Sequence, residues 1–225
     1  MGIAKDGTKK DSFTPGIIIE AKQTIFTEGA RGSLTERLKK HFQLEKDSVS
    51  IQNYGIGLKE VWEVAEGNPH FKEGLVHHTV NWPVTSDVYA GSFMYHMKPN
   101  KVLLGMVVGL DYKNPYLNPY EEFQMLKTHP DFRKILEGGQ CISYGARVLN
   151  EGGYHAIPKL TFPGGMLAGC SAGFLNVAKI KGTHNAMKTG MLAAESIFDS
   201  LEDLESKELK EYEKSVKSSW VAKEL

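Results

Sequence analysis

The stretch Ala90–Tyr112, AGSFMYHMKPNKVLLGMVVGLDY, decides the fold class. Its first part alternates in character up to Met97, which is typical of a strand with one buried face. Lys98–Asn100 then supplies a turn before a second, more apolar strand begins at Lys101. Two strands joined by so short a turn pair antiparallel, so this stretch predicts a β-hairpin.

The segments on either side of the hairpin are also strand-like. Residues 51–64 form one candidate strand, interrupted at Gly55 and Gly57, and residues 74–84 form another. Because successive strands without an intervening helix favour an antiparallel sheet, we expect one here. The neighbouring His77 and His78 would face opposite sides of such a strand and cannot bind one metal ion together.

Other segments show helical or strand spacing around this sheet. Pro130 divides the helical pattern of residues 119–136, which predicts two short helices with Phe123, Leu126 and Ile135 inward. Apolar residues recur at three- and four-residue steps through residues 34–42 and 183–201, which predicts two more helices. Further strands are expected over residues 16–21, 23–27 and 140–149.

The composition limits the classes of protein to be considered. The chain has 225 residues, 41% hydrophobic and 24% charged, with 27 Lys plus Arg against 27 Asp plus Glu. This balance argues against a general nucleic-acid surface. The only cysteines, Cys141 and Cys170, form no CxxC pair, so this chain alone builds neither a zinc ribbon nor an iron–sulfur site. No secretory leader, targeting segment or apolar run of membrane-spanning length is found.

The segment Gly164–Glu195, GGMLAGCSAGFLNVAKIKGTHNAMKTGMLAAE, combines a short strand, a small-residue turn and a helix. Thr183 is a plausible N-cap for that helix, although Ala186 leaves the capping box incomplete. Free N–H groups at such a helix start favour an electron-rich or anionic group. A tight strand-to-helix connection, with small residues for packing, is the alternative.

Six blocks of the sequence together resemble one family. They are YGIGLKEVW (54–62), HTVNWP (78–83), GSFMYH (91–96), VVGLDYKNPYLNP (107–119), YGARVLNEGGYHAIPKLTFPGG (144–165) and KIKGTHNAMKTGMLAAESIF (179–198). With these blocks the chain resembles the electron-transfer flavoprotein–ubiquinone oxidoreductase family. The resemblance implies an α+β fold, a fragment of the flavoprotein-reductase type with an antiparallel-sheet quinone-binding domain.

The resemblance also implies a division of the chain. Residues 1–35 and 160–201 would belong to the FAD domain, residues 36–159 to the ubiquinone-binding domain, and residues 202–225 to a membrane-surface or connecting helix. The chain is expected to be the central part of the enzyme. It lacks the N-terminal dinucleotide-binding segment and the C-terminal cysteines that would ligate the iron–sulfur cluster.

Site residues carry over from the resemblance by position. The implied FAD contacts are Glu28 and Gly29 in one turn, Gly169 and Cys170 in a second, and Gly182 and Thr183 at the helix start. Ala90 and Gly91 correspond to the quinone-pocket turn, where the family usually has two glycines. No metal ligand and no catalytic acid or base is expected, because the protein's role is to position cofactors.

The resemblance finally implies a reaction and a location. The whole enzyme would take electrons from reduced electron-transfer flavoprotein through FAD and the iron–sulfur cluster to ubiquinone, at the matrix side of the mitochondrial inner membrane. Leu209, Tyr212, Val216 and Trp220 would lie at the membrane surface, or else form the packed stripe of a connecting helix. Alternatives are another flavin-dependent reductase of the prenyl-lipid type, or an inactive truncated product that serves as an interaction module.

Overall fold

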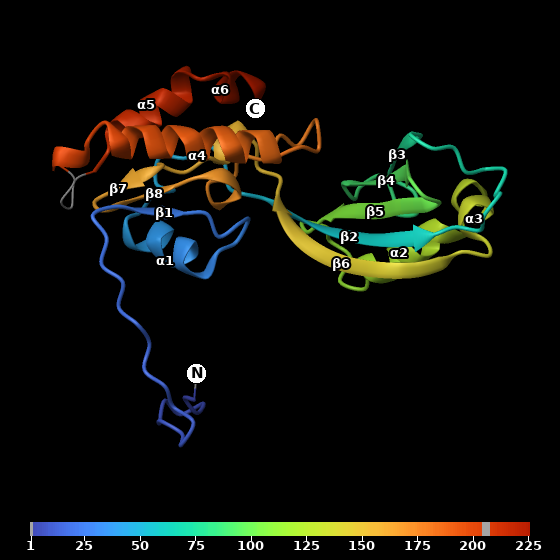
Figure 1. Ribbon diagram of the computed structural model, residues 1–225, viewed down its shortest axis with the longest axis horizontal. Coiled ribbons are helices and arrows are strands. Elements are labelled where there is room, and N and C mark those ends of the chain that lie inside the picture. Colours follow the sequence, from blue (N-terminus) through green and yellow to red (C-terminus); the bar gives the residue numbers. More distant parts are fainter. Residues whose placement is uncertain (1, 204–207) are drawn as a thin grey trace.

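The computed structural model describes residues 2–203 and 208–225, which fold around two separate hydrophobic cores (Figure 1). In chain order the strands and α-helices are β1 (Thr24–Phe26), α1 (Ser33–His41), β2 (Tyr54–Glu63), β3 (Val76–Val80), β4 (Ala90–Met97), β5 (Lys101–Gly109), α2 (Pro119–Thr128), α3 (Pro130–Leu136), β6 (Gln140–Asn150), β7 (Thr161–Phe162), β8 (Gly165–Leu167), α4 (Thr183–Phe198), α5 (Lys210–Ser218) and α6 (Trp220–Glu224).

The larger sheet is antiparallel throughout, with the strand order β3-β4-β5-β2-β6. The predicted hairpin is confirmed as β4 and β5, which pair from Ala90↔Val108 to Met97↔Lys101. Helices α2 and α3 pack against one face of this sheet (Figure 1). Both helices have proline near their first position, and Asn118 caps α2 by accepting a hydrogen bond from the Tyr120 amide. The expected break at Pro130 is therefore confirmed.

The smaller sheet has the order β1-β8-β7, with β1 parallel and β7 antiparallel to the central β8. Figure 1 shows α1 on one side of this sheet and α4, α5 and α6 on the other. The core between these layers includes Phe162, Met166, Leu167, Tyr212 and Val221. β2 and β6 run from this part into the larger sheet and connect the two cores (Figure 1).

One expectation for the N-terminal part needs correction. Residues 16–21 form no strand; Ile17, Ile18 and Ile19 lie in an extended segment and are 86–90% exposed. The three isoleucines favour a strand, but this segment pairs with neither of the two sheets. Leu38 and Leu44 pack into the core of the smaller sheet, and the larger sheet begins at Tyr54. The expected division of the chain at residue 36 stays a prediction.

The apolar stripe of the C-terminal segment is packed on the protein. Leu209, Tyr212 and Val216 are buried in the core of the smaller sheet, whereas Trp220 remains 43% exposed. This matches the packed-stripe alternative for these three residues. The physical reason is that α5 lies against α4 and β7, which leaves its apolar side no contact with lipid. Residues 204–207 of the segment lie outside the described residues.

Candidate functional site

A cavity of about 390 Å³ lies between the larger sheet and the loop of residues 175–180. Ala90 and Gly91, the residues predicted to contact a quinone, both line it. Apolar side chains make up most of the remaining wall: Val80, Phe93, Val107, Leu149, Leu175, Val177, Ala178 and Ile180. An apolar cavity with few polar groups is the usual form of a small-molecule site.

The cavity lies on the sheet face opposite α2 and α3. Along β4 the core-facing residues Met94 and His96 are buried beneath the helices, while Gly91 and Phe93 face the other way. The register places Val80 and Val107 beside Gly91 on that face. The alternation along residues 90–97 therefore has a simple structural basis: one face of the sheet packs on the core, and the other face lines the cavity.

Few polar groups reach this cavity. Those among the lining residues are His78, Thr79, Tyr89, Ser92, Glu151 and Lys179. Thr79 and Ser92 share a short hydroxyl–hydroxyl hydrogen bond across β3 and β4, so they are satisfied by each other. Burial raises the pKa of the Glu151 carboxyl to about 7, and the negative charge of Asp111 adds to the effect.

The loop that covers the cavity is held from the C-terminal helix. Asn176 and Lys181 form an antiparallel bridge, which makes residues 177–180 the tip of a tight turn with Ile180 at φ 56°. Glu224 of α6 anchors the turn because its backbone oxygen accepts a hydrogen bond of 2.8 Å from Asn176 Nδ2. Its carboxylate also lies 2.8 Å from Nζ of Lys179. One residue of α6 therefore fixes the position of the cavity's cover.

The predicted FAD contacts gather at one edge of the smaller sheet. β1 and β8 are parallel and in register from Thr24↔Gly165 to Phe26↔Leu167, so their carboxyl ends meet. The turn with Glu28 and Gly29 follows one strand, and the turn with Gly169 and Cys170 follows the other. The crevice outside the carboxyl ends of parallel strands is the usual ligand position in α/β sheets.

Glu28 has a structural contact at this edge. Its Oε2 accepts hydrogen bonds of 2.7 Å from the Thr35 amide and 2.8 Å from the Thr35 hydroxyl, at the start of α1. These bonds, the Thr35 hydroxyl first, hold the pKa of the Glu28 carboxyl below its ordinary value. Gly29 has φ +89° and open space where a side chain would be. The turn therefore presents bare backbone at Gly29, while Glu28 stabilises α1.

The second turn lies against the start of α4. The amide of Gly169 donates a hydrogen bond of 3.0 Å to Thr189 Oγ1. A methyl group added at Gly182 would lie 3.9 Å from Cys170 Sγ, so these two residues are neighbours. Burial raises the pKa of the Cys170 thiol, which keeps it protonated at neutral pH.

The expected N-cap at Thr183 is wrong by one residue. Gly182 is the cap, and it forms no side-chain hydrogen bond, because glycine has no side-chain oxygen to accept one from a backbone amide. Thr183 is the first helical residue and is exposed. Asn185, in contrast, is buried and donates a hydrogen bond of 3.0 Å to the carbonyl oxygen of Phe174. The helix start therefore keeps amide groups available for a ligand.

The site contains residues that the sequence did not single out. Glu151 and the loop residues Val177–Ile180 line the cavity with Ala90 and Gly91. A carboxyl between the end of a strand and the pair Gly152–Gly153 was the available signal for Glu151. The sequence of the loop gives no comparable indication that it lines a cavity, because Val177–Ile180 reads as an ordinary connecting segment.

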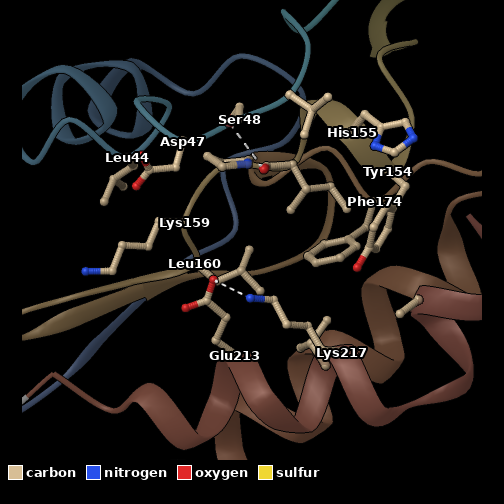
Figure 2. Close-up of a pocket in the computed structure, with 15 residues that line it drawn as sticks. Leu44, Asp47, Ser48, Tyr154, His155, Lys159, Leu160, Phe174, Glu213 and Lys217 are labelled. Atoms are coloured by element: carbon tan, nitrogen blue, oxygen red, sulfur yellow. Dashed lines mark hydrogen bonds and ion pairs between the residues drawn. The ribbon is translucent and has the colours of Figure 1, made fainter.

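A larger cavity, of about 450 Å³, is lined by none of the residues predicted to bind flavin or quinone. Figure 2 shows Leu44, Tyr154, Phe174 and the charged Glu213 and Lys217 around it. Within the described residues there is no group of three or more side chains suited to hold a metal ion. No helix in that same part of the chain is long and apolar enough to cross a membrane.

Solved structures with this fold include flavoproteins. A geranylgeranyl bacteriochlorophyll reductase-like protein from Thermoplasma acidophilum matches 88% of this chain and 46% of its own, with a TM-score of 0.67 at 17% identity. A flavin-dependent brominase matches 86% of this chain and 47% of its own, with a TM-score of 0.54 at 18% identity. Identities this low show a shared fold only. The expected flavoprotein-reductase fold with an antiparallel sheet is confirmed.

Sequence comparison is more specific. Residues 54–149 match the family model described as ETF-QO, ubiquinone-binding. The mitochondrial electron transfer flavoprotein–ubiquinone oxidoreductase of Homo sapiens is 56% identical over 233 residues, which cover 100% of this chain. The chain spans 37% of the length of that relative. Because the match extends through the whole chain, this protein belongs to the electron transfer flavoprotein–ubiquinone oxidoreductase family.

Proposed function

We propose that this chain supplies the ubiquinone-binding part, and one wall of the flavin site, of an oxidoreductase of this family. The whole enzyme passes electrons from reduced electron-transfer flavoprotein, through FAD and an iron–sulfur cluster, to ubiquinone. Its place is the matrix side of the mitochondrial inner membrane, in keeping with the mitochondrial name of the human relative. The observation that carries the proposal is the apolar cavity at Ala90 and Gly91.

The cavity suits a quinone head group in size and chemistry. A quinone ring is flat and apolar except for two carbonyl oxygens and their neighbouring ether groups. Gly91 offers no side chain on the cavity face of β4, so a ring can approach the strand closely. The apolar wall excludes water from the ring, and Glu151 is placed to meet one of its oxygens.

The predicted flavin contacts fit a flavin on observations independent of the cavity. Gly29 leaves open space beside the backbone, and the start of α4 has no side-chain cap. Amide groups near Gly182 and Thr183 would hold the electron-rich edge of the ring, while Gly169 and Cys170 lie alongside. When bound, FAD supplies the electron transfer. This chain's residues would bind and orient it.

The iron–sulfur cluster does not fit the residues described here. A cluster needs several thiolates, and this chain has two cysteines in separate places. Cys141 lies on β6 in the larger sheet, whereas Cys170 lies at the edge of the smaller one. We therefore derive no step through the cluster. In the proposal it belongs to a part of the longer relatives that this chain does not match.

Quinone binding by the purified chain tests the proposal. Decylubiquinone is titrated into the chain by isothermal calorimetry, with an alkylbenzene of equal tail length as the control for non-specific apolar binding. We expect saturable binding of one quinone per chain and much weaker binding of the control. Equal, unsaturable uptake of both compounds would refute the proposal and would favour the alternative of an interaction module.

A further inference from the structure

Glu151 stands out among the cavity residues because its carboxyl group has no partner. It lines the cavity from the end of β6, where its amide donates a hydrogen bond of 2.7 Å to the carbonyl oxygen of Asn53. Within residues 2–203 and 208–225 the carboxyl oxygens make no hydrogen bond or ion pair. A half-buried carboxyl without a partner is unusual in a folded protein, and it is free to interact with a ligand.

A pair of glycines creates the space for this carboxyl. Gly55 of β2 and Gly109 of β5 are direct partners across the sheet. A methyl group added at Gly55 would lie 2.3 Å from Oε1 of Glu151, and one added at Gly109 would lie 3.3 Å from Oε2. Any side chain at Gly55 would therefore displace the carboxyl. The two glycines leave room for the carboxyl on this face of the sheet, at the rim of the proposed quinone cavity.

The carboxyl also connects the cavity with the surface. The same added methyl at Gly109 would lie 3.2 Å from Oδ1 of Asp111 and 3.3 Å from the carbonyl oxygen of Tyr89, the residue before Ala90. Asp111 is exposed and lines a separate surface cleft of about 300 Å³, together with Arg31 and Tyr54. Glu151 thus lies between the apolar cavity and a carboxyl group that is in contact with solvent.

We propose that Glu151 is the proton donor to the quinone in this cavity and that Asp111 returns the proton from solvent. This inference rests on the proposed function. A quinone takes up two electrons and two protons to become a quinol. The carboxyl O–H of Glu151 breaks and a new O–H bond forms on one quinone oxygen, while the electrons come from the reduced flavin. Glu151 is left as a carboxylate, which Asp111 reprotonates. The second quinone oxygen takes its proton from solvent.

The charges around Glu151 suit this role. Burial, and then the negative charge of Asp111, raise the pKa of the Glu151 carboxyl to about 7, so about half of the carboxyls hold a proton at neutral pH. The other titratable or charged groups that line the two spaces are His78, Tyr89 and Lys179 in the cavity, and Arg31 and Tyr54 in the cleft beyond Asp111. Lys179 and Arg31 carry the positive charges among these groups.

Quinone affinity as a function of pH tests the contact between Glu151 and the quinone. A protonated carboxyl donates a hydrogen bond to the quinone oxygen, whereas a carboxylate repels it. We expect decylubiquinone affinity of the chain to fall about 10-fold between pH 6 and pH 8.5, the equivalent of one lost hydrogen bond. Glu151→Gln keeps a donor without a charge, so its affinity should not depend on pH. Glu137→Gln, at an exposed glutamate, is the matched control and should follow the unsubstituted chain.

Turnover tests the proton transfer itself. A chimera in which this chain replaces the matching 37% of the human relative supplies the rest of the enzyme. Glu151→Gln should slow quinone reduction about 100-fold, the usual loss when a general acid is removed. Reduction of ferricenium, which takes an electron without a proton, should be unchanged. Asp111→Asn should slow quinone reduction less, and more at high pH, because only the return of the proton is affected.

The outcomes separate this inference from the proposed function. Quinone binding that is independent of pH, with Glu151→Gln turning over at the unsubstituted rate, overturns the role of Glu151 and leaves the quinone site intact. Loss of ferricenium reduction along with quinone reduction shows damage to the flavin site and also overturns it. A chain that binds no quinone at any pH overturns both.

Discussion

The hydroxyl of Tyr212 donates a hydrogen bond of 2.9 Å to the carbonyl oxygen of Leu167, in the core of the smaller sheet. Tyr212 belongs to α5, and Leu167 ends the central strand β8 just before the turn of Gly169 and Cys170. Both residues are fully buried. Desolvation raises the pKa of the Tyr212 hydroxyl far above its ordinary value. The hydroxyl therefore keeps its proton, and remains a hydrogen-bond donor, at every pH at which the chain is folded.

Tyr212→Phe should therefore destabilise the chain by about 1–2 kcal/mol, because the buried carbonyl of Leu167 loses its donor while packing is kept. Urea unfolding followed by far-UV circular dichroism measures the loss as a lower midpoint. Tyr144→Phe is the matched control, since Tyr144 is 87% exposed on β6 and should change nothing. Equal midpoints for the two variants would contradict a structural role for this bond.

A second buried pair fixes α2 to the larger sheet. Nζ of Lys127 lies 2.9 Å from Oε2 of Glu60, which also accepts a hydrogen bond of 2.6 Å from Trp62 Nε1. Lys127→Ala should cost about 3 kcal/mol, because it leaves the Glu60 carboxylate buried without its cation. Lys134→Ala removes the exposed pair with Asp131 and should cost less than about 0.5 kcal/mol. If urea unfolding showed similar losses of stability for both variants, the buried ion pair would be no more stabilising than the exposed one, against this prediction.

The larger sheet shows how far the sequence predicts the fold. Alternation along β4 and the turn at residues 98–100 were sufficient for the hairpin, because both signals are local. The expected interruption at Gly55 and Gly57 is wrong, since β2 runs unbroken through both. Glycine weakens a strand in isolation, but here it makes room for side chains from elsewhere: the Glu151 carboxyl at Gly55 and Leu149 at Gly57.

Helix α4 shows what periodicity leaves undetermined. The three- and four-residue spacing through residues 183–201 predicted the helix correctly, yet Met187, Met191 and Phe198, which follow this spacing, are more than half exposed. The buried face carries Asn185 and Thr189, whose side chains bond to the carbonyl of Phe174 and the amide of Gly169. Both faces repeat every 3.6 residues, so spacing alone cannot tell which one packs inward.

The candidate site was predictable only where the family resemblance reached. Ala90 and Gly91 line a cavity, and the six residues predicted to contact the flavin lie in neighbouring turns. The binding roles of all eight residues stay predictions. Glu151 was missed because its significance depends on Gly55, Gly109 and Asp111, which the sheet brings to it from distant parts of the chain. Contacts between residues so far apart in the sequence cannot be predicted from a local pattern.

Filling the cavity should abolish quinone binding. Val107→Phe places a ring on the cavity face beside Gly91, where the quinone ring would lie, so we expect at least a 30-fold loss of decylubiquinone affinity in calorimetry. Val107→Ala should retain binding, because it only enlarges the space. Ala146→Phe, at an exposed position of β6, is the matched control for an added ring on the sheet. Unchanged affinity in Val107→Phe would place the quinone elsewhere.

Glu151 should also leave a signature in stability that does not depend on any ligand. Its pKa is about 7 in the folded chain against an ordinary value of 4.5, so the folded state holds more protons between these values. The contribution of this group to stability is therefore complete below pH 4.5 and is lost as pH rises through 7. Between pH 5 and pH 8 the unsubstituted chain should lose about 1 kcal/mol relative to Glu151→Gln, less than the full shift implies because the side chain is half exposed. Urea midpoints across this range measure the difference, with Glu137→Gln following the unsubstituted chain. Parallel pH profiles for Glu151→Gln and the unsubstituted chain would mean that Glu151 is ionised throughout, and that it holds no proton to give.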